Sequence, residues 1–135
     1  MTTAQIDLTQ KFNCSAEFLF SAWLYSKKHG KIIGSNAYIQ PEVNSKFSMW
    51  SRTIQGKNVK IDKKNPIIIQ QCRSEYGDWT LNNPSTVTIK FEPLKDGTSL
   101  VRLTQYRIPE NHVSNIQEGW NDYYWEPVRA YLEKV

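Results

Sequence analysis

The stretch GWNDYYWEPVRAYL, residues 119–132, decides how this chain folds. Its apolar residues recur at helical spacing, which predicts one long C-terminal helix with an aromatic face. The stripe consists of Ile116, Trp120, Tyr124, Val128 and Tyr131 or Leu132. We expect Trp120 and Tyr124 to face a curved sheet and to be largely buried. The rings either form ordinary core or line a pocket between helix and sheet.

Pro127 lies inside this predicted helix. A proline there removes one backbone hydrogen bond and clashes with the preceding turn. We therefore expect a kink near Tyr123.

A strand and two short helices are predicted at the start of the chain. Residues 6–12 alternate between apolar and polar, as a half-buried strand does. Ser15 is placed to cap a helix that buries Trp23, and Ser26 is placed to cap a second one. Gly34 supplies a stop for that second helix.

The middle of the chain changes to a period of two, which indicates antiparallel strands. Turn signals separate the strands, among them an Asp96-Gly97 hairpin turn, and residues 76–84 read as a loop. The alternating segments lie at 46–49, 67–73, 87–91 and 101–105, and a further strand ends with Val59 and Ile61. The predicted fold is α+β, with a curved sheet of about six or seven antiparallel strands and a long C-terminal helix.

Composition favours a single domain over residues 1–135, because a chain of this length usually folds as one unit. The net charge of +4 is mild, so two lysine-rich groups, at 27–31 and 57–64, read as solvated surface and no nucleic-acid partner is expected. The sequence contains no apolar run long enough for a membrane span and no secretory signal. Cys14 and Cys72, each in an expected strand, read as reduced thiols of a cytoplasmic protein.

Motifs for catalysis, metals or cofactors are absent, so we expect none of the three. His29 sits among lysines and is expected to be solvated, while His112 is expected at the surface. Each carboxylate near a predicted loop is better explained as a surface charge than as a general acid or base.

Four motifs, in this order and spacing, resemble one known family. They are SAEFLFSAWL at 15–24, PEV and KFSMW at 41–50, TVTI at 86–89 and GWNDYYW at 119–125. The first resembles the opening helix of the START-like, birch-pollen-allergen (SRPBCC) superfamily. Together they resemble the family named for homology to the activator of the heat-shock protein 90 ATPase, and the resemblance covers nearly the whole chain.

This resemblance implies the helix-grip fold, in which a sheet wraps around the C-terminal helix and can enclose a cavity for apolar molecules. This sequence departs from the pattern of that family at three places: Asn44-Ser45 stands where the family usually has Gly-Gly, Cys72 where it has Trp, and Arg107 where it has Gly. The thiol at 72 should leave room that an indole would fill. The eukaryotic co-chaperone carries a further N-terminal domain, for which this chain has no room.

We therefore expect a small ligand-binding protein that holds a hydrophobic or amphipathic small molecule, or a lipid, without catalysis. The alternatives are a filled core, a chaperone cofactor or stress-response interaction module, and an enzyme such as a cyclase. The expected ligand-binding residues are Trp23, Phe47, Met49, Gln70, Cys72, Trp79, Gln105, Trp120 and Tyr124.

Overall fold

The computed structural model describes residues 3–49, 54–74 and 85–134. Its seven strands form one antiparallel sheet in the order β1-β7-β6-β5-β4-β3-β2. The strands are β1 (Thr3–Phe12), β2 (Ala37–Tyr38), β3 (Lys46–Met49), β4 (Ile54–Asp62), β5 (Ile67–Ser74), β6 (Ser85–Pro93) and β7 (Ser99–Pro109). The predicted antiparallel sheet is confirmed; β2 has only two residues, too few to produce a periodic pattern.

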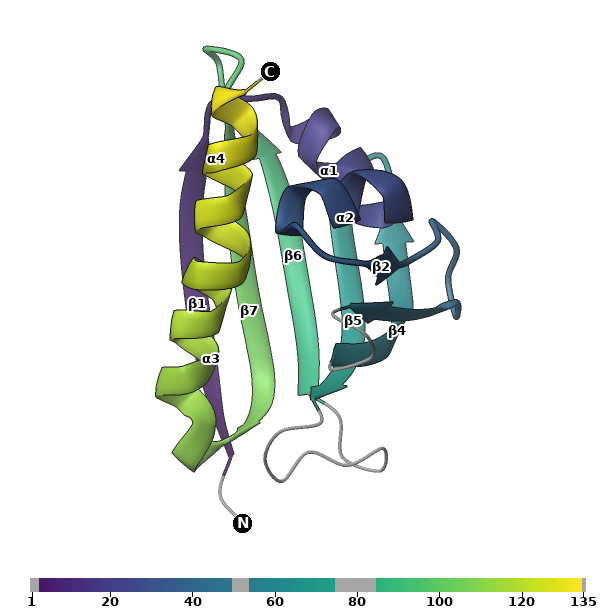
Figure 1. The fold of residues 1–135 in the computed structure, drawn as a ribbon, viewed down its shortest axis with the longest axis vertical. Coiled ribbons are helices and arrows are strands. Elements are labelled where there is room, and N and C mark those ends of the chain that lie inside the picture. The colour runs from purple at the N-terminus through teal and green to yellow at the C-terminus, as the bar shows by residue number, and fades with distance from the viewer. Residues whose placement is uncertain (1–2, 50–53, 75–84, 135) are drawn as a thin grey trace.

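All the helices lie on one face of this sheet (Figure 1). The helical segments are α1 (Ala16–Leu24), α2 (Ser26–Ile33), η1 (Glu110–His112), α3 (Val113–Trp120), the π-helical turn η2 (Asn121–Trp125) and α4 (Glu126–Glu133). From α3 to α4 the chain forms one long helical rod beside β1 and β7, whereas α1 and α2 cover the other end of the same face (Figure 1). We call the helix-covered face concave and the opposite face convex.

The helix ends agree with the sequence at two of three predicted positions. The Ser15 hydroxyl accepts a hydrogen bond from the Phe18 backbone N–H at 3.1 Å, so the predicted cap is confirmed. Gly34 ends α2 with a φ of 69°, a left-handed conformation that suits glycine. Ser26 does not cap α2. Its hydroxyl instead bonds both the N–H and the C=O of Ile39, which ties the start of α2 to the segment after β2.

The rod does not continue as a plain α-helix through the predicted kink. Residues 121–125 form a wider turn in which the Glu126 N–H bonds the Asn121 carbonyl, five residues back. This turn precedes Pro127, whose missing N–H would otherwise leave an α-helical bond unmade. One extra residue in the turn lets the consecutive side chains of Tyr124 and Trp125 both contact the core.

Burial along the rod therefore differs from the predicted stripe. Trp125, which the helical period leaves out, is only 2% exposed, whereas Trp120 and Tyr124 are partly buried. Both rings pack against the core, as expected, whereas the burial of Trp125 departs from the predicted stripe. The reason is the π-helical turn, which rotates α4 relative to α3 and brings Trp125 inward.

Two of the residues that depart from the family pattern have left-handed backbone conformations. Asn44 has a φ of 68° and Arg107 a φ of 62°. Asparagine tolerates this region, as predicted, but arginine adopts it at a cost. Cys14 also differs from expectation, because it lies just after β1 rather than within a strand.

Candidate functional site

Polar side chains are buried together on the concave face, where apolar ones are the rule. They are Asn58 on β4, Gln70 and Cys72 on β5, Ser85 on β6 and Gln105 on β7, and we call them the concave polar patch. They lie close because the strand register sets Asn58 opposite Gln70 and Cys72 opposite Ser85.

Hydrogen bonds join this patch into two pairs across strands. Gln70 Nε2 donates to Asn58 Oδ1 at 2.9 Å, and Asn58 Nδ2 donates to the Gln40 carbonyl at 2.8 Å. Gln105 Nε2 donates to Ser85 Oγ at 2.8 Å. The Cys72 thiol lies 3.5 Å from the same hydroxyl oxygen. Buried polar groups need such partners, because an unpaired one costs about 1–3 kcal/mol.

The helical rod is tied to this patch through Trp120. Its indole Nε1 donates to Gln105 Oε1 at 2.8 Å. Trp120 also packs against Tyr124 and Trp125, with ring centroids 4.8 Å and 5.6 Å away. A partly buried tryptophan therefore lies over the polar patch and is oriented by it.

His29 provides a second link between the rod and the rest of the site. Its Nδ1 lies 2.8 Å from the Trp23 carbonyl, and its Nε2 lies 3.1 Å from the Tyr124 hydroxyl. A carbonyl only accepts, so Nδ1 carries the proton and the Tyr124 hydroxyl donates to Nε2. The expectation that His29 is solvated was wrong, since the ring is 2% exposed and stacks edge-on against Trp23.

The titratable groups of the site are neutral at pH 7. Burial lowers the pKa of His29 to about 4, against the smaller opposing effect of its bond to the Trp23 carbonyl. Burial raises the pKa of Cys72 to about 11 and that of Tyr124 above its ordinary value, with a further rise for Tyr124 from the nearby Cys72. The site therefore offers neutral donors and acceptors rather than a thiolate nucleophile or a charged base.

Most of the predicted ligand-binding residues share one cluster in the structure. Phe47, Met49, Cys72 and Trp23 are buried in the main core, with Trp120 and Tyr124 packed against it. Gln70 and Gln105 belong to the concave polar patch on the same face. Trp79 lies outside the described residues.

Three members of the site were not predicted: His29, Asn58 and Ser85. Ser85 and Asn58 stand opposite Cys72 and Gln70, a pairing that depends on the strand register and has no local signal in the sequence. His29 carried no such signal, since its sequence neighbours are lysines and its burial depends on α2 folding over Trp23.

Close approach of three strands shapes the edge of the patch at Gly56. A Cβ at this position would lie 2.0 Å from the Gln71 carbonyl oxygen and 2.7 Å from Phe47 Cζ. Only glycine fits without moving the backbone, so Phe47 can pack directly against the β4–β5 pair beside Cys72.

Other kinds of site find little support in the part of the chain that the structure describes. No three His, Cys, Asp or Glu side chains there gather in a way that could hold a metal ion. Of the helices described, none is long and apolar enough to cross a membrane.

Comparison with protein families decides which group the chain falls into. The family model described as "Activator of Hsp90 ATPase homolog 1-like protein" matches residues 13–133. The chain belongs to this family. The resemblance inferred from the four sequence motifs is thereby confirmed.

One curated relative in this family is the mouse (Mus musculus) "Activator of 90 kDa heat shock protein ATPase homolog 2". It is 26% identical over 132 residues, which cover 97% of this chain and 38% of the mouse protein. The chain thus spans well under half the length of this Hsp90-activator relative.

Solved structures show the same fold. The crystal structure of an HSP90 activator from Plasmodium falciparum superposes with a TM-score of 0.86 at 24% identity and covers 96% of each chain. Norcoclaurine synthase from Thalictrum flavum, solved in complex with dopamine and hydroxybenzaldehyde, has a TM-score of 0.67 at 11% identity, covering 98% of this chain and 88% of the other. The predicted helix-grip fold is confirmed, and the fold includes an enzyme as well as a chaperone activator.

Proposed function

We propose that this protein binds a neutral amphipathic small molecule between the helical rod and the concave face. The observation that carries the proposal is the concave polar patch, which lies beneath the partly buried Trp120. A core that served packing alone would gain more from apolar side chains at these positions, because buried polar groups add little net stability.

The chemistry of the patch favours a ligand with an apolar or aromatic body and an uncharged polar head. Trp23, Trp120 and Tyr124 supply ring faces, with Trp23 and Tyr124 stacked at 5.0 Å between centroids. Gln105 and Gln70 supply amide groups that both donate and accept. A charged head would be disfavoured, because no described group of the site carries a compensating charge at pH 7.

We propose binding without turnover. The His29 and Tyr124 protons are committed to hydrogen bonds, and the pKa of the Cys72 thiol is raised, so none of the three is poised for proton transfer or nucleophilic attack at pH 7. Norcoclaurine synthase, which shares the fold, was solved in complex with dopamine and hydroxybenzaldehyde, so a protein of this fold can hold small aromatic molecules. The affinity we expect is micromolar, on the order of −8 kcal/mol.

Mass spectrometry of small molecules that co-purify with the native protein is the direct test. The second arm measures an apolar fluorescent probe against the wild type and Cys72→Trp. If Cys72 lines the binding space, the indole should weaken probe binding at small cost in stability. Unchanged probe affinity in a folded Cys72→Trp protein would remove Cys72 from the site. The absence of both a co-purifying molecule and probe binding would contradict the proposal.

A second candidate function is a chaperone cofactor, and the family membership is what favours it. The mouse relative and the Plasmodium structure are both named as activators of Hsp90 or its ATPase. The test is the ATPase rate of an Hsp90-class chaperone with and without this protein, beside a pulldown of the two. Stimulation of that rate would support the role, and neither binding nor stimulation would contradict it.

A further inference from the structure

Among the residues that the structure describes, no helix covers the convex face of the sheet (Figure 1), and this face combines charged and apolar side chains. Lys46, Lys57, Lys60 and Lys90 are exposed on it, and the half-buried Ile67 and Ile69 lie among them. We call these six residues the convex basic face. It lies on the opposite side of the sheet from the proposed ligand site and therefore goes beyond that function.

The register places two lysines directly opposite each other. Lys46 on β3 pairs with Lys57 on β4, both exposed. Like charges at facing positions destabilise a sheet, whereas a lysine facing a carboxylate would stabilise it. The cost would fall if an external anion bound between the two ammonium groups.

The carboxylates nearby are already engaged. Glu92 pairs with Arg102 at 3.1 Å, and Asp62 accepts hydrogen bonds from the backbone N–H groups of Lys64 and Asn65. Within the described residues, the four lysines of the convex basic face have no ion pair within 4.0 Å. Lys60 is close enough to Asp62 to add to the lowering of that carboxyl's pKa, which comes mainly from the backbone hydrogen bond of Asn65, while Lys46, Lys57 and Lys90 are exposed to solvent.

The two isoleucines distinguish this surface from a uniformly solvated one. Ile69 faces Lys60 across the β4–β5 pair, and Ile67 faces Lys90 across the β5–β6 pair. Ile67 also faces Asp62 at the end of the β4–β5 hairpin, so the two isoleucines have charged residues beside them. Apolar side chains bordered by charged ones are common at protein–protein interfaces. Two exposed tyrosines, Tyr38 on β2 and Tyr106 on β7, also lie on this side of the sheet. A single-stranded nucleic acid could stack on them, so binding of an oligonucleotide is the rival outcome that the test must separate.

We propose that the convex basic face docks an acidic segment of a protein partner. Carboxylates of the segment pair with Lys46, Lys57 and Lys60, and its apolar side chains cover Ile67 and Ile69. The lysines favour a negatively charged segment through charge complementarity, and the isoleucines favour a segment that also carries apolar side chains.

Lys57→Glu separates a binding role from a structural one, because it should weaken peptide binding without lowering the thermal midpoint. The new carboxylate faces Lys46, so the thermal midpoint should rise or stay level. Binding of a labelled synthetic peptide in which glutamate and leucine alternate should weaken about tenfold in fluorescence anisotropy.

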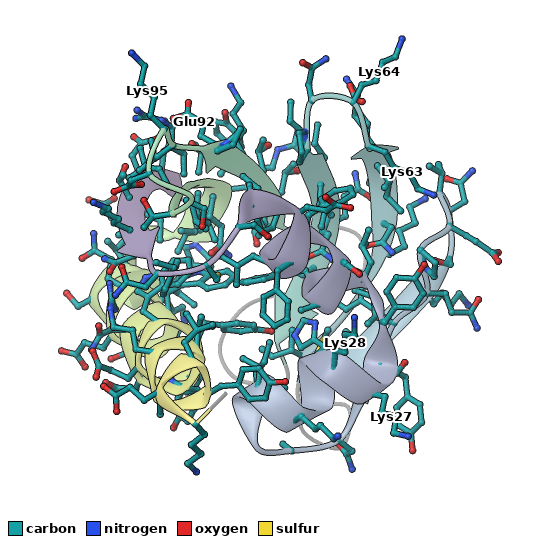
Figure 2. The ribbon with its side chains drawn as sticks, turned by 90° about the horizontal axis from the view of Figure 1, so that it is seen from above. Lys27, Lys28, Lys63, Lys64, Glu92 and Lys95 are labelled. Atoms are coloured by element: carbon teal, nitrogen blue, oxygen red, sulfur yellow. The ribbon has the colours of Figure 1, made fainter. Side chains whose placement is uncertain are left out.

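Lys28→Glu on α2 is the matched control. It lowers the formal net charge of +4 by the same two units. Lys28 lies on α2, which covers the concave face (Figure 1), whereas Lys57 and Lys60 belong to β4 and point to the opposite face. Figure 2 shows Lys28 well apart from Lys63 and Lys64, which mark the end of the β4–β5 hairpin. Peptide affinity should stay within about twofold of the wild type in this control.

Ile69→Thr tests the apolar half of the surface. It should weaken the glutamate–leucine peptide but leave binding of a glutamate–serine peptide unchanged. The proposal is overturned if the wild type binds neither peptide, if Lys28→Glu and Lys57→Glu lose affinity equally, or if a single-stranded oligonucleotide binds more tightly than the peptide.

Discussion

The two ends of the concave face are built from the same strands but filled differently. At one end Phe91 on β6 and Val101 on β7 are paired and pack in the apolar core together with Val128 of α4. At the other end Ser85 and Gln105 are bonded to each other, beneath Trp120 of α3. We call these the apolar end and the polar end. The apolar end stabilises the fold through buried apolar side chains, whereas the polar end carries hydrogen-bonding groups that the stability of the fold does not require.

Trp125→Ala should have the largest effect, because this ring is buried at the junction of the two ends. We expect a loss of about 3–5 kcal/mol in the free energy of unfolding, as for other large aromatic truncations in cores. Trp120→Ala should cost less, about 1–3 kcal/mol, mainly because Gln105 Oε1 loses its donor. Denaturant melts measure both, and an equal or larger loss for Trp120→Ala would erase the distinction between the ends.

Acid should destabilise the protein through His29. The pKa of this ring is about 4 in the folded chain and 6.5 as the ordinary value, so the unfolded state binds more protons between these values. Stability is therefore full above pH 6.5 and falls as the pH drops towards 4, by about 3 kcal/mol from this group.

His29→Gln should flatten that part of the pH dependence, because a glutamine side chain does not take up a proton there. Chemical unfolding at a series of pH values measures the slope. The same slope in wild type and His29→Gln would show that His29 is not buried in its neutral form.

Gln105→Leu tests the polar end directly. The substitution removes the donor to Ser85 Oγ and the acceptor of the Trp120 indole N–H, so we expect a loss of about 1–3 kcal/mol in stability. It should also weaken a ligand with a hydrogen-bonding head group more than a purely apolar one, measured by calorimetry with paired ligands. Equal losses for the two ligands would take Gln105 out of the binding site.

Ser99→Ala is the matched control for a buried polar group away from this site. Ser99 Oγ is fully buried at the other end of β7, and among the described residues its one possible hydrogen-bond partner is the weakly bonding Cys14 thiol. Its removal should change stability by less than about 1 kcal/mol in either direction.

Arg107→Gly should give the smallest effect, and a favourable one. A non-glycine residue with a φ of 62° carries strain of about 1–2 kcal/mol. Glycine relieves it but adds about 0.4–1 kcal/mol of unfolded-chain entropy, so a net gain of about 0.5–1 kcal/mol remains. Asn44→Gly should gain less, because asparagine tolerates this conformation. A lower thermal midpoint for Arg107→Gly would show that the arginine side chain makes a contact worth more than the strain.

The sequence predicts the faces of the elements well, because side-chain alternation depends only on local geometry. Val87, Ile89 and Phe91 are buried and Lys90 is exposed, as their period of two requires. Gln70, Cys72 and Gln105 were placed on the concave face for the same reason. That they sit with Ser85 and Asn58 depends on strand register, which no local pattern reveals.

Two misplacements have separate physical causes. His29 was assigned to solvent from its lysine neighbours, but a helix turns one side chain inward while its neighbours stay exposed. Trp125 was missed because a helical period of 3.6 residues assumes an unbroken α-helix. A single π-helical turn adds one residue to the count, so Trp125 also faces the core, while Val128 remains buried as the period predicts.

The number of residues in the helical rod is therefore fixed, and the loss of even one would change which side chains face the sheet. Deleting one residue between Asn121 and Tyr124 would restore ordinary α-helical bonding and turn α4 by about 100° relative to α3. Trp125 would then move into the place of Tyr124, and the hydroxyl that reaches His29 would be lost. An indel in this turn would therefore break either the contact with α2 or the packing of the core, whereas a substitution at the exposed Asp122 would disturb neither.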